Sequence, residues 1–293
     1  MIPSVSVVIP SYNPKTSLLR ELYDSLLSQS LGDFEVILVD DASSDVSAYA
    51  CIQDKRFRIL YQGRNHGPAA CRNRGARAAE SEFLFFTDTD CVLDPDALKQ
   101  VVDNLYGGAI LMGNTITRVR TPFGRAVALL GFPGGGILGF DKVWRVDEEG
   151  YTNSFSSCAL AFRKVVFETL GEFDETFPVA GGEDTVLARQ AVLAGCRIRY
   201  VPAIRVFHVE KGDLCGFLRW QLTRGRGNYH IKKRVDKVGG YLKLRFWTFK
   251  NSLRAAGPRY FLPVGALIVL SVAFQLTGML LEARRINHHP HKS

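Results

Sequence analysis

Two aspartates one residue apart, Asp88 and Asp90, follow a mostly apolar run of five residues, 83–87. If that run is a buried strand, both carboxylates lie at its carboxyl end, where open α/β sheets bind their ligands. Carboxylate oxygens are preferred ligands of Mg²⁺ and Mn²⁺, and such an ion commonly joins protein carboxylates to the phosphates of a substrate. Asp and Thr are also common turn residues, so a pair of this kind standing alone is more often a solvated turn.

Polar side chains also follow the first two predicted strands, over residues 4–9 and 34–39. Ser11 and Tyr12 come after the first of these strands, and Asp41 comes after the second. Because parallel strands end at the same edge of a sheet, we expect these residues to lie near the aspartate pair. An aspartate at this place accepts hydrogen bonds from a base or ribose in related folds, and Asp41 is equally suited to capping the turn that follows.

A second group of candidates lies about one hundred residues further on. Glu183 and Asp184 precede a predicted helix over residues 185–194. Acidic residues at a helix start are favoured by capping and by the helix dipole, and the functional alternative is a general base at the mouth of the site. His208 lies among apolar residues of a predicted strand over 205–209, where a histidine is more often a satisfied core or edge residue than a ligand.

Strands and helices alternate along the first hundred residues. Runs rich in β-branched and aromatic residues predict the strands, and apolar residues at helical spacing predict the helices. The predicted strands are 4–9, 34–39, 57–61 and the run from 83, and the predicted helices are 15–29, a short one ending near 54, and 67–79. This order predicts βαβ units and a mainly parallel sheet. No GxGxxG follows the first predicted strand and the chain has no GxxxxGK[ST], which argues against a dehydrogenase and a P-loop NTPase.

The pattern is less regular beyond residue 96. The predicted elements there are a helix over 97–106, a strand over 110–119, a strand over 157–163, a short helix over 164–170, and two short strands over 197–201 and 205–209. Residues 120–150 lose periodicity and contain the run FPGGG, which predicts a flexible loop or lid over the site. Residues 171–177 predict an exposed turn.

Length and cysteine usage limit the class of protein. At 293 residues we expect one large domain with appendages, or two domains. The six cysteines are scattered, with no CxxC pair, which favours reduced thiols in a reducing compartment. No charged stretch followed by an apolar one opens the chain, so we expect no signal peptide and a cytosolic amino-terminal body.

The carboxy-terminal part combines a basic segment with an apolar one. Residues 211–259 contain thirteen Lys or Arg and two Asp, and residues 260–281 contain no charge. About 20 apolar residues suffice to cross a bilayer, so the second segment is a candidate membrane helix, and a buried carboxy-terminal helix is the alternative. A basic stretch beside it favours a membrane surface. The basic stretch lacks interleaved aromatic platforms of a recognised type, so nucleic acid is not an expected partner.

Six motifs, taken in order, resemble the family 2 glycosyltransferases of GT-A fold, and the match covers about residues 4–210. They are VSVVIPSYNP, VILVDDASSD, RNHGPAACRNRGARAA, FLFFTDTDCVLDP, GEFDE and GGEDTVLARQAVLAG. The resemblance implies an α/β protein with a GT-A (Rossmann-like), mainly parallel mixed sheet flanked by helices. It also implies transfer of a sugar from a nucleotide-diphosphate donor to an acceptor hydroxyl, with inversion at the anomeric carbon.

The resemblance implies a role for each candidate residue. On the donor side, Ser11, Tyr12 and Asp41 hold the nucleoside, Arg72 lies near the donor, and Asp88 and Asp90 hold Mg²⁺ or Mn²⁺ on the diphosphate. Asp184 is the catalytic base, Glu183 lies beside it on the acceptor side, and His208 completes the metal site. For His208 this reverses the interpretation reached from the residue alone.

The same comparison predicts how the chain is divided. We expect a glycosyltransferase domain over 1–210, with a nucleotide-binding half (1–107) and an acceptor-binding half (108–210). We expect a basic helical extension over 211–259, an apolar tail helix over 260–281 that is a candidate membrane helix, and a polar tail over 282–293.

One departure from the family pattern bears on the reaction. Processive synthases of this family carry Gln-x-x-Arg-Trp, whereas Gln221 and Arg224 are followed here by Gly225. Together with the single candidate span, this favours transfer of a single sugar. We expect a lipid-linked or membrane-proximal acceptor in glycan, polysaccharide or cell-envelope biosynthesis, at the cytoplasmic face of a membrane, with the tail as a single-pass or tail anchor. The alternatives are a soluble transferase acting on a protein or small molecule, and a non-catalytic module that binds a nucleotide sugar.

Overall fold

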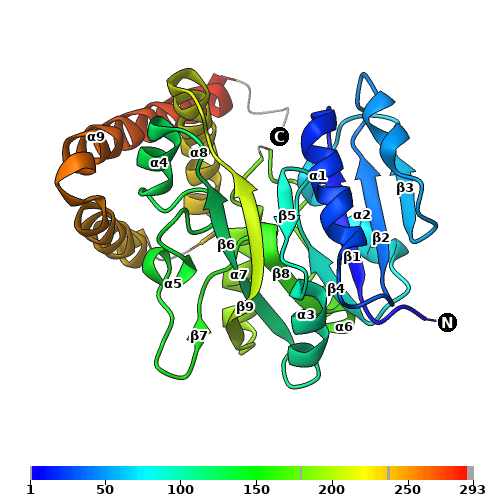
Figure 1. Cartoon of the computed structure of the whole chain (residues 1–293). Coiled ribbons are helices and arrows are strands. Elements are labelled where there is room, and N and C mark those ends of the chain that lie inside the picture. The colour runs from blue at the N-terminus through cyan, green and yellow to red at the C-terminus, as the bar shows by residue number, and fades with distance from the viewer. Residues whose placement is uncertain (1, 179, 236–237, 289–293) are drawn as a thin grey trace.

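A mixed sheet runs through the middle of the molecule (Figure 1). The computed structural model describes residues 2–178, 180–235 and 238–288. Within them the sheet has nine strands, in the order β3-β2-β1-β4-β8-β6-β9-β5, with β7 paired to β9. The strands are β1 (Ser6–Ser11), β2 (Glu35–Asp40), β3 (Phe57–Tyr61), β4 (Phe83–Phe86), β5 (Cys91–Leu93), β6 (Ile110–Arg118), β7 (Tyr151–Thr152), β8 (Leu160–Arg163) and β9 (Ile198–Val209).

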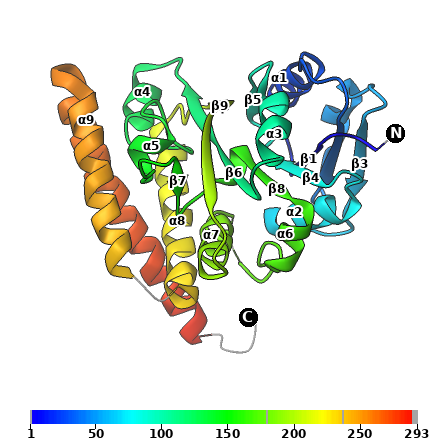
Figure 2. The same cartoon turned by 90° about the horizontal axis from the view of Figure 1, so that it is seen from below.

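Helices cover both faces of the sheet. Figure 2 shows α1 and α3 on one face and α2 and α6 on the other. The α-helices are α1 (Thr16–Leu27), α2 (Pro68–Ala78), α3 (Ala97–Leu105), α4 (Pro122–Ala128), α5 (Phe140–Val143), α6 (Lys164–Thr169), α7 (Glu183–Leu193), α8 (Leu214–Arg234) and α9 (Val238–His288). Two short 3₁₀ helices are η1 (Ser47–Cys51) and η2 (Ser157–Ala159). The expected α/β class with a mixed sheet is confirmed.

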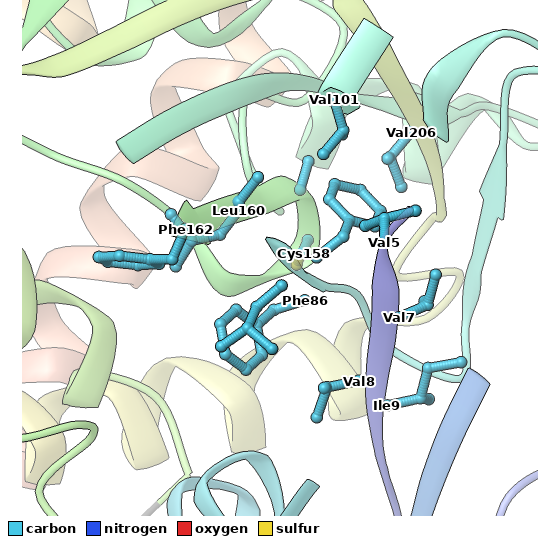
Figure 3. Packing of buried hydrophobic residues seen from close by; sticks show 14 of the residues in the cluster. Val5, Val7, Val8, Ile9, Phe86, Val101, Cys158, Leu160, Phe162 and Val206 are labelled. Carbon is cyan, nitrogen blue, oxygen red and sulfur yellow. The ribbon is translucent and has the colours of Figure 1, made fainter. Parts of the chain in front are cut away.

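The first half of the sheet is parallel. β1 pairs in parallel with β2 and with β4, and β2 pairs in parallel with β3. Figure 3 shows Val7 and Ile9 on one side of β1 and Val8 on the other, and all three are at most 1% exposed. A strand covered on both faces needs apolar residues at every position, which explains the uninterrupted β-branched run. The predicted strand over 57–61 has the bounds of β3.

The second half of the sheet is mixed. β8 is antiparallel to both β4 and β6, and β5 is antiparallel to β9. β9 is one strand, so the prediction of two short strands over 197–201 and 205–209 is wrong. Its pairing with β6 shifts register between Met112 and Asn114, where Gly113 packs directly against Ile204. A bulge lets β9 continue as one strand although its pairing with β6 is interrupted. The sequence pattern indicated this interruption as a gap between two strands.

Two segments predicted as loops are folded into the core. Residues 120–150 contain α4, α5 and the beginning of the path to β7, so the expectation of a flexible loop there is wrong. In the predicted exposed turn over 171–177, Phe173 is 2% exposed and packs edge-on against Phe86. Apolar side chains in both segments are buried by tertiary contacts, which local periodicity does not report.

The carboxy-terminal helices form a layer beside the end of the sheet that lies away from β3 (Figures 1 and 2). The backbone of α9 is non-helical at Gly257, which divides the helix into arms over 238–256 and 258–288. Both arms and α8 share a second apolar cluster with α4 and the segment after it, and its buried members are Ala126, Val127, Leu129, Leu130, Phe132, Phe217, Ala256, Val264 and Leu267. The predicted domain boundaries at 107, 210 and 259 stay predictions.

The second arm of α9 turns polar side chains toward α8. Ser271 Oγ donates to Gln221 Oε1 over 2.9 Å, and Gln275 Nε2 donates to the same oxygen over 2.7 Å. The helices touch at Gly278, where an added Cβ would lie 2.2 Å from the backbone oxygen of Leu222. Small residues and polar bonds at the contact are typical of helix pairs in membranes.

The opposite side of this arm is apolar and exposed. Its exposed large side chains are Phe261, Leu262, Val269, Val272, Leu276, Leu280 and Leu281. Among the described residues, one helical stretch (243–287) is long and apolar enough to cross a membrane, and 22% of its most apolar window is buried. The alternative of a buried tail helix therefore does not fit this side. The polar tail begins as helix up to residue 288, and 289–293 lie outside the described residues.

Candidate active site

The nine site residues predicted from sequence line one cavity of about 900 Å³. It lies at the carboxyl ends of β1, β2 and β4, and α7 and α8 close its other side. The nine are Ser11, Tyr12, Asp41, Arg72, Asp88, Asp90, Glu183, Asp184 and His208. Strands that end at a common edge bring together residues from distant parts of the chain, as expected for an open α/β sheet.

Asp41 organises the wall of the cavity next to β2. Its carboxylate accepts the backbone N–H of His66 over 2.7 Å and that of Gly67 over 2.8 Å. It also accepts a hydrogen bond from Gln62 Nε2 over 3.0 Å. The carboxylate of Asp41 thus fixes the loop that leads into α2 and not the turn that follows residue 41, so the capping alternative for Asp41 is wrong. In that turn the backbone N–H of Ser43 donates to Asp40 Oδ2 over 3.1 Å. On the same side Ser11 is buried and Tyr12 is exposed.

The side chain of Arg72 binds two acidic residues of the cavity wall, one from the end of β4 and one from the start of α7. Its guanidinium donates to Asp88 Oδ1 from Nη2 and to Glu183 Oε1 from Nη1, both over 2.8 Å. Burial alone would lower the pKa of Arg72, but the charges of the two carboxylates raise it, so the side chain stays positive. Its Nε is buried without a hydrogen-bond partner among the described residues.

Asp88 is a carboxylate held in the charged form. Its Oδ1 accepts from Arg72, and its Oδ2 accepts the thiol of Cys158 over 3.2 Å. Burial would raise the pKa of Asp88, but the charge and hydrogen bond of Arg72 outweigh it, so the pKa lies below its ordinary value. A carboxylate must be deprotonated to bind a cation, and Asp88 meets that condition.

Asp90 and His208 face each other across the β5–β9 pairing. His208 Nδ1 lies 2.8 Å from the backbone oxygen of Val209, and since a carbonyl only accepts, Nδ1 carries the proton. In this tautomer the lone pair of the ring lies on Nε2, which is 3.3 Å from Asp90 Oδ1. Neighbouring ligands of an octahedral ion at about 2.1 Å are about 3 Å apart, so Asp90 and His208 lie at the spacing of two ligands of one divalent cation. Asp88 does not form a group with them within 4.8 Å, so its side chain must shift to share an ion with this pair.

Asp184 lies where the main cavity meets a smaller one. The second cavity, of about 130 Å³, is lined by Trp144 and Trp220 among others, and Asp184 borders both. Burial and the negative charge of Glu183 raise the pKa of Asp184 to about 6. A carboxyl with such a pKa is a stronger base than an ordinary aspartate and is still charged at neutral pH.

The backbone conformation of Gly182 positions the side chains of Glu183 and Asp184. Gly182 precedes α7 with a φ of 126°, and an added Cβ would lie 2.7 Å from Phe177 Cζ. Glu183 is buried beneath it, where Oε2 accepts the backbone N–H of Gly181 over 2.9 Å. The chain can make this turn only without a side chain at residue 182, and the turn points Asp184 to the junction of the cavities.

Residues 6–169 match the family model described as Glycosyl transferase family 2. The chain belongs to this family. Its expected membership is confirmed, and the chain is therefore a glycosyltransferase of family 2.

Of three curated relatives, two are named as biosynthesis proteins, of succinoglycan and of O-antigen, and the third is named as a glycosyltransferase. The chain is 26% identical over 231 residues to the succinoglycan biosynthesis protein ExoO of Rhizobium meliloti, covering 74% of this chain and 64% of that protein. It is 26% identical over 267 residues to an N-acetylglucosaminyltransferase of Azorhizobium caulinodans, covering 81% and 64%. With the O-antigen biosynthesis protein RfbC of Myxococcus xanthus it shares 30% identity, covering 72% and 18%. The chain thus spans less than two thirds of these relatives.

A solved structure has a similar fold. The mannosyltransferase PcManGT from Pyrobaculum calidifontis, in complex with GDP-Man and Mn²⁺, superposes with a TM-score of 0.57 at 21% identity. The likeness covers 100% of this chain and 82% of that one. It confirms the expected GT-A type of fold.

Two residues of the glycosyltransferase site were missed from sequence. Cys158 reaches the cavity from η2, which the sequence pattern had merged into a strand. Trp220 of α8 lines both cavities, and its ring packs edge-on against Phe132. Arg224 lies over the faces of both rings and borders both cavities. In the sequence, the pair Trp220–Gln221 was the feature that could have indicated this wall of the cavity.

Proposed function

We propose that the chain transfers a single sugar from a nucleotide-diphosphate donor to an acceptor hydroxyl, with inversion at the anomeric carbon. The observation that carries the proposal is the placement of Asp184, a carboxyl with a pKa of about 6 at the junction of two cavities. The larger cavity also holds the carboxylates suited to a cation, so donor and base share one site.

The larger cavity suits the donor. Its volume of about 900 Å³ falls within the range usual for ligand sites. Ser11, Tyr12 and Asp41 would hold the nucleoside, and Arg72 supplies positive charge beside the diphosphate. Asp88, Asp90 and His208 would hold Mg²⁺ or Mn²⁺, which when bound acts as a Lewis acid on the departing diphosphate. The Mn²⁺ and GDP-Man named for the structural neighbour support this class of cofactor and donor.

Asp184 acts as the general base. An alcohol is a poor nucleophile, so a carboxylate must accept its proton as it attacks, which contributes about 10²–10⁴-fold to the rate. Inversion needs no covalent intermediate, so one carboxylate suffices, by analogy with inverting glycosidases. Glu183 lies next to Asp184, lines the larger cavity and accepts a hydrogen bond from Arg72, and it tunes the base through its charge.

The acceptor enters through the smaller cavity in this proposal. That cavity adjoins α8, and its aromatic lining of Trp144 and Trp220 offers flat apolar surfaces to a sugar or lipid-linked group. The exposed apolar side of α9 lies in the same helical layer (Figure 2). This arrangement supports an acceptor that is lipid-linked or close to a membrane, as in glycan or cell-envelope biosynthesis.

The tail helix binds the cytoplasmic face of a membrane and lies in its plane. α8 runs beside the second arm of α9, and Arg224 of α8 borders the catalytic cavity. Crossing the bilayer would carry this wall of the cavity into lipid, at a high cost for its charges. A helix with one apolar exposed side and arginines near both ends, such as Arg259 and Arg284, suits the interface instead.

The base assignment is tested by Asp184→Asn, with Asp103→Asn as the control. Asp103 is exposed on α3, where its ion pair with Lys99 contributes little. We expect Asp184→Asn to lower kcat by about 10²–10⁴-fold while the donor Kd is unchanged, and Asp103→Asn to behave as the wild type. Normal turnover by the Asp184 variant would show that the base is another group. Retention of the donor configuration in the product would contradict inversion.

A further inference from the structure

Three buried side chains that could bind a metal ion meet behind the aspartate pair. The two Sγ atoms of Cys91 and Cys158 and an imidazole nitrogen of His208 all lie within 4.8 Å of one another. Their exposed fractions are 0%, 8% and 6%. The cysteines are 67 residues apart, so their spacing in the sequence does not indicate a shared site.

The fold assembles the cluster from three elements. Cys91 in β5 is the direct partner of His208 in the antiparallel pairing with β9. Cys158 stands in η2, immediately before β8. Each side chain is thus fixed by hydrogen-bonded backbone, which orders the three ligand atoms before any ion arrives.

The donor set differs in kind from that of the cation site for the diphosphate. Mg²⁺ and Mn²⁺ prefer oxygen, whereas thiolate and imidazole select Zn²⁺ and other thiophilic ions. Zinc binds sulfur at about 2.3 Å and histidine nitrogen at about 2.0–2.1 Å, nearly always with four ligands. Asp88 Oδ2 lies 3.2 Å from Cys158 Sγ, at the edge of the cluster but outside the group whose ligand atoms all lie within 4.8 Å of one another. The fourth position is therefore left to water or to a ligand from the cavity.

We propose that Cys91, Cys158 and His208 form a binding site for Zn²⁺ or a similar thiophilic divalent cation. Cys158 and His208 both border the large cavity, so an ion reaches the cluster from the donor side. Cys91 lies behind them and closes the site from within the core.

The alternative is that the cysteines only fill space. Figure 3 shows Cys158 among buried apolar side chains that include Phe86 and Leu160, and free cysteine is a common small apolar core residue. That alternative accounts for Cys91 but not for Cys158, whose thiol points to a charged carboxylate at a cavity wall. A core position needs no such polar partner.

Occupation of the cluster has a consequence for the reaction. His208 belongs to both donor sets, so the thiophilic ion and the ion on the diphosphate exclude one another. Zn²⁺ is then an inhibitor of transfer that competes with Mn²⁺ or Mg²⁺. This consequence rests on the proposed function, whereas binding of the ion to the cluster does not.

Binding is tested first, without donor, on the full chain under a reductant that is not itself a thiol. Co²⁺ serves as the probe, because cobalt bound to thiolate gives a sulfur-to-metal charge-transfer absorption that oxygen and nitrogen ligands do not give. We expect this absorption in the wild type, its loss in Cys91→Ser, and its retention in Cys196→Ser, a thiol outside the cluster. Titration calorimetry with Zn²⁺ should show at least tenfold weaker binding to Cys91→Ser.

Cys158→Ser is the second variant in case Cys91→Ser does not fold, and thermal unfolding of the ion-free proteins checks both. A folded wild type without the absorption overturns the proposal, as does equal absorption from the folded serine variants.

The inhibition is tested separately by transfer assays at a fixed Mn²⁺ concentration. We expect Zn²⁺ to inhibit the wild type and Cys196→Ser alike, and Cys91→Ser to need at least tenfold more Zn²⁺. Equal sensitivity of all three proteins overturns the mutual exclusion. If cobalt binds the thiols but no nucleotide sugar is turned over, the proposed function fails and the cluster stands.

Discussion

The guanidinium of Arg72 lies 2.8 Å from the carboxylate of Glu183, a residue 111 positions further along the chain. Both side chains are at most 5% exposed. Since Arg72 also binds Asp88, one side chain of α2 connects the end of β4 with the start of α7. The distance between the base and the cation site is therefore set by a buried ion-pair network.

The rate should depend on pH through Asp184. The base works only when deprotonated, so we expect kcat/KM to rise with pH and level off above about 6, the pKa of Asp184 in the folded chain. The measurement is kcat/KM against pH at saturating Mn²⁺. A profile that is flat across this range would contradict the assignment.

Glu183→Gln should shift that profile to lower pH. The glutamine can keep a hydrogen bond to the network but removes the negative charge that raises the pKa of Asp184. We expect the acid limb of kcat/KM to move down, with Glu168→Gln, on the exposed part of α6, as a control that leaves it in place. An unshifted limb in a folded Glu183 variant would show that this charge does not act on the base.

The raised pKa of Asp184 also makes the free energy of unfolding depend on pH. Because the pKa of Asp184 is higher in the folded chain than its ordinary value of 3.8, folding favours the protonated form. The stabilisation is complete below that ordinary value and is lost as pH rises through about 6. We therefore expect Asp184→Asn to gain stability relative to the wild type between acidic and neutral pH, measured by urea unfolding at both. If the stability difference between Asp184→Asn and the wild type is the same at both pH values, the pKa of Asp184 is not raised in the folded chain.

Gly182→Ala should destabilise the chain and misplace the acidic pair. The substitution adds a Cβ that clashes with Phe177 and also strains a backbone with φ 126°, a conformation that costs about 1–3 kcal/mol for other residues. Gly195→Ala, at the other end of α7, is the matched control, since its φ is 78° but no atom lies within 4 Å of the added Cβ. Urea unfolding should show the larger loss for residue 182. Equal losses would mean that the contact with Phe177 is easily relieved.

The exposed side of α9 should govern binding to lipid. Replacing Leu262, Val269 and Leu276 together by Gln removes apolar area that would enter the membrane interface, and should lower vesicle binding by at least about tenfold. Flotation with vesicles that contain anionic lipid measures the effect. Val165→Gln with Leu193→Gln, exposed apolar residues on α6 and α7, is the control. Wild-type protein that stays with the soluble fraction would remove the membrane proposal.

Much of the site was predictable because its polar residues lie at the carboxyl ends of strands that the sequence identifies. The runs before Ser11, Asp41 and Asp88 are apolar enough to identify buried strands, and the parallel arrangement brings their ends together. β5 was not predicted, because three residues after a turn give no period to detect. The burial of Phe173 and the place of Trp220 depend on partners far along the chain, so local pattern does not report them.

The central claim is that Asp88 and Asp90 hold a divalent cation on the diphosphate of the donor. A crystal structure with Mn²⁺ and a nucleotide-diphosphate sugar, phased to locate manganese by its anomalous scattering, tests this directly. We predict one manganese peak bound by these carboxylates and by His208, in contact with diphosphate oxygens. A bound donor with no manganese at these side chains would contradict the account.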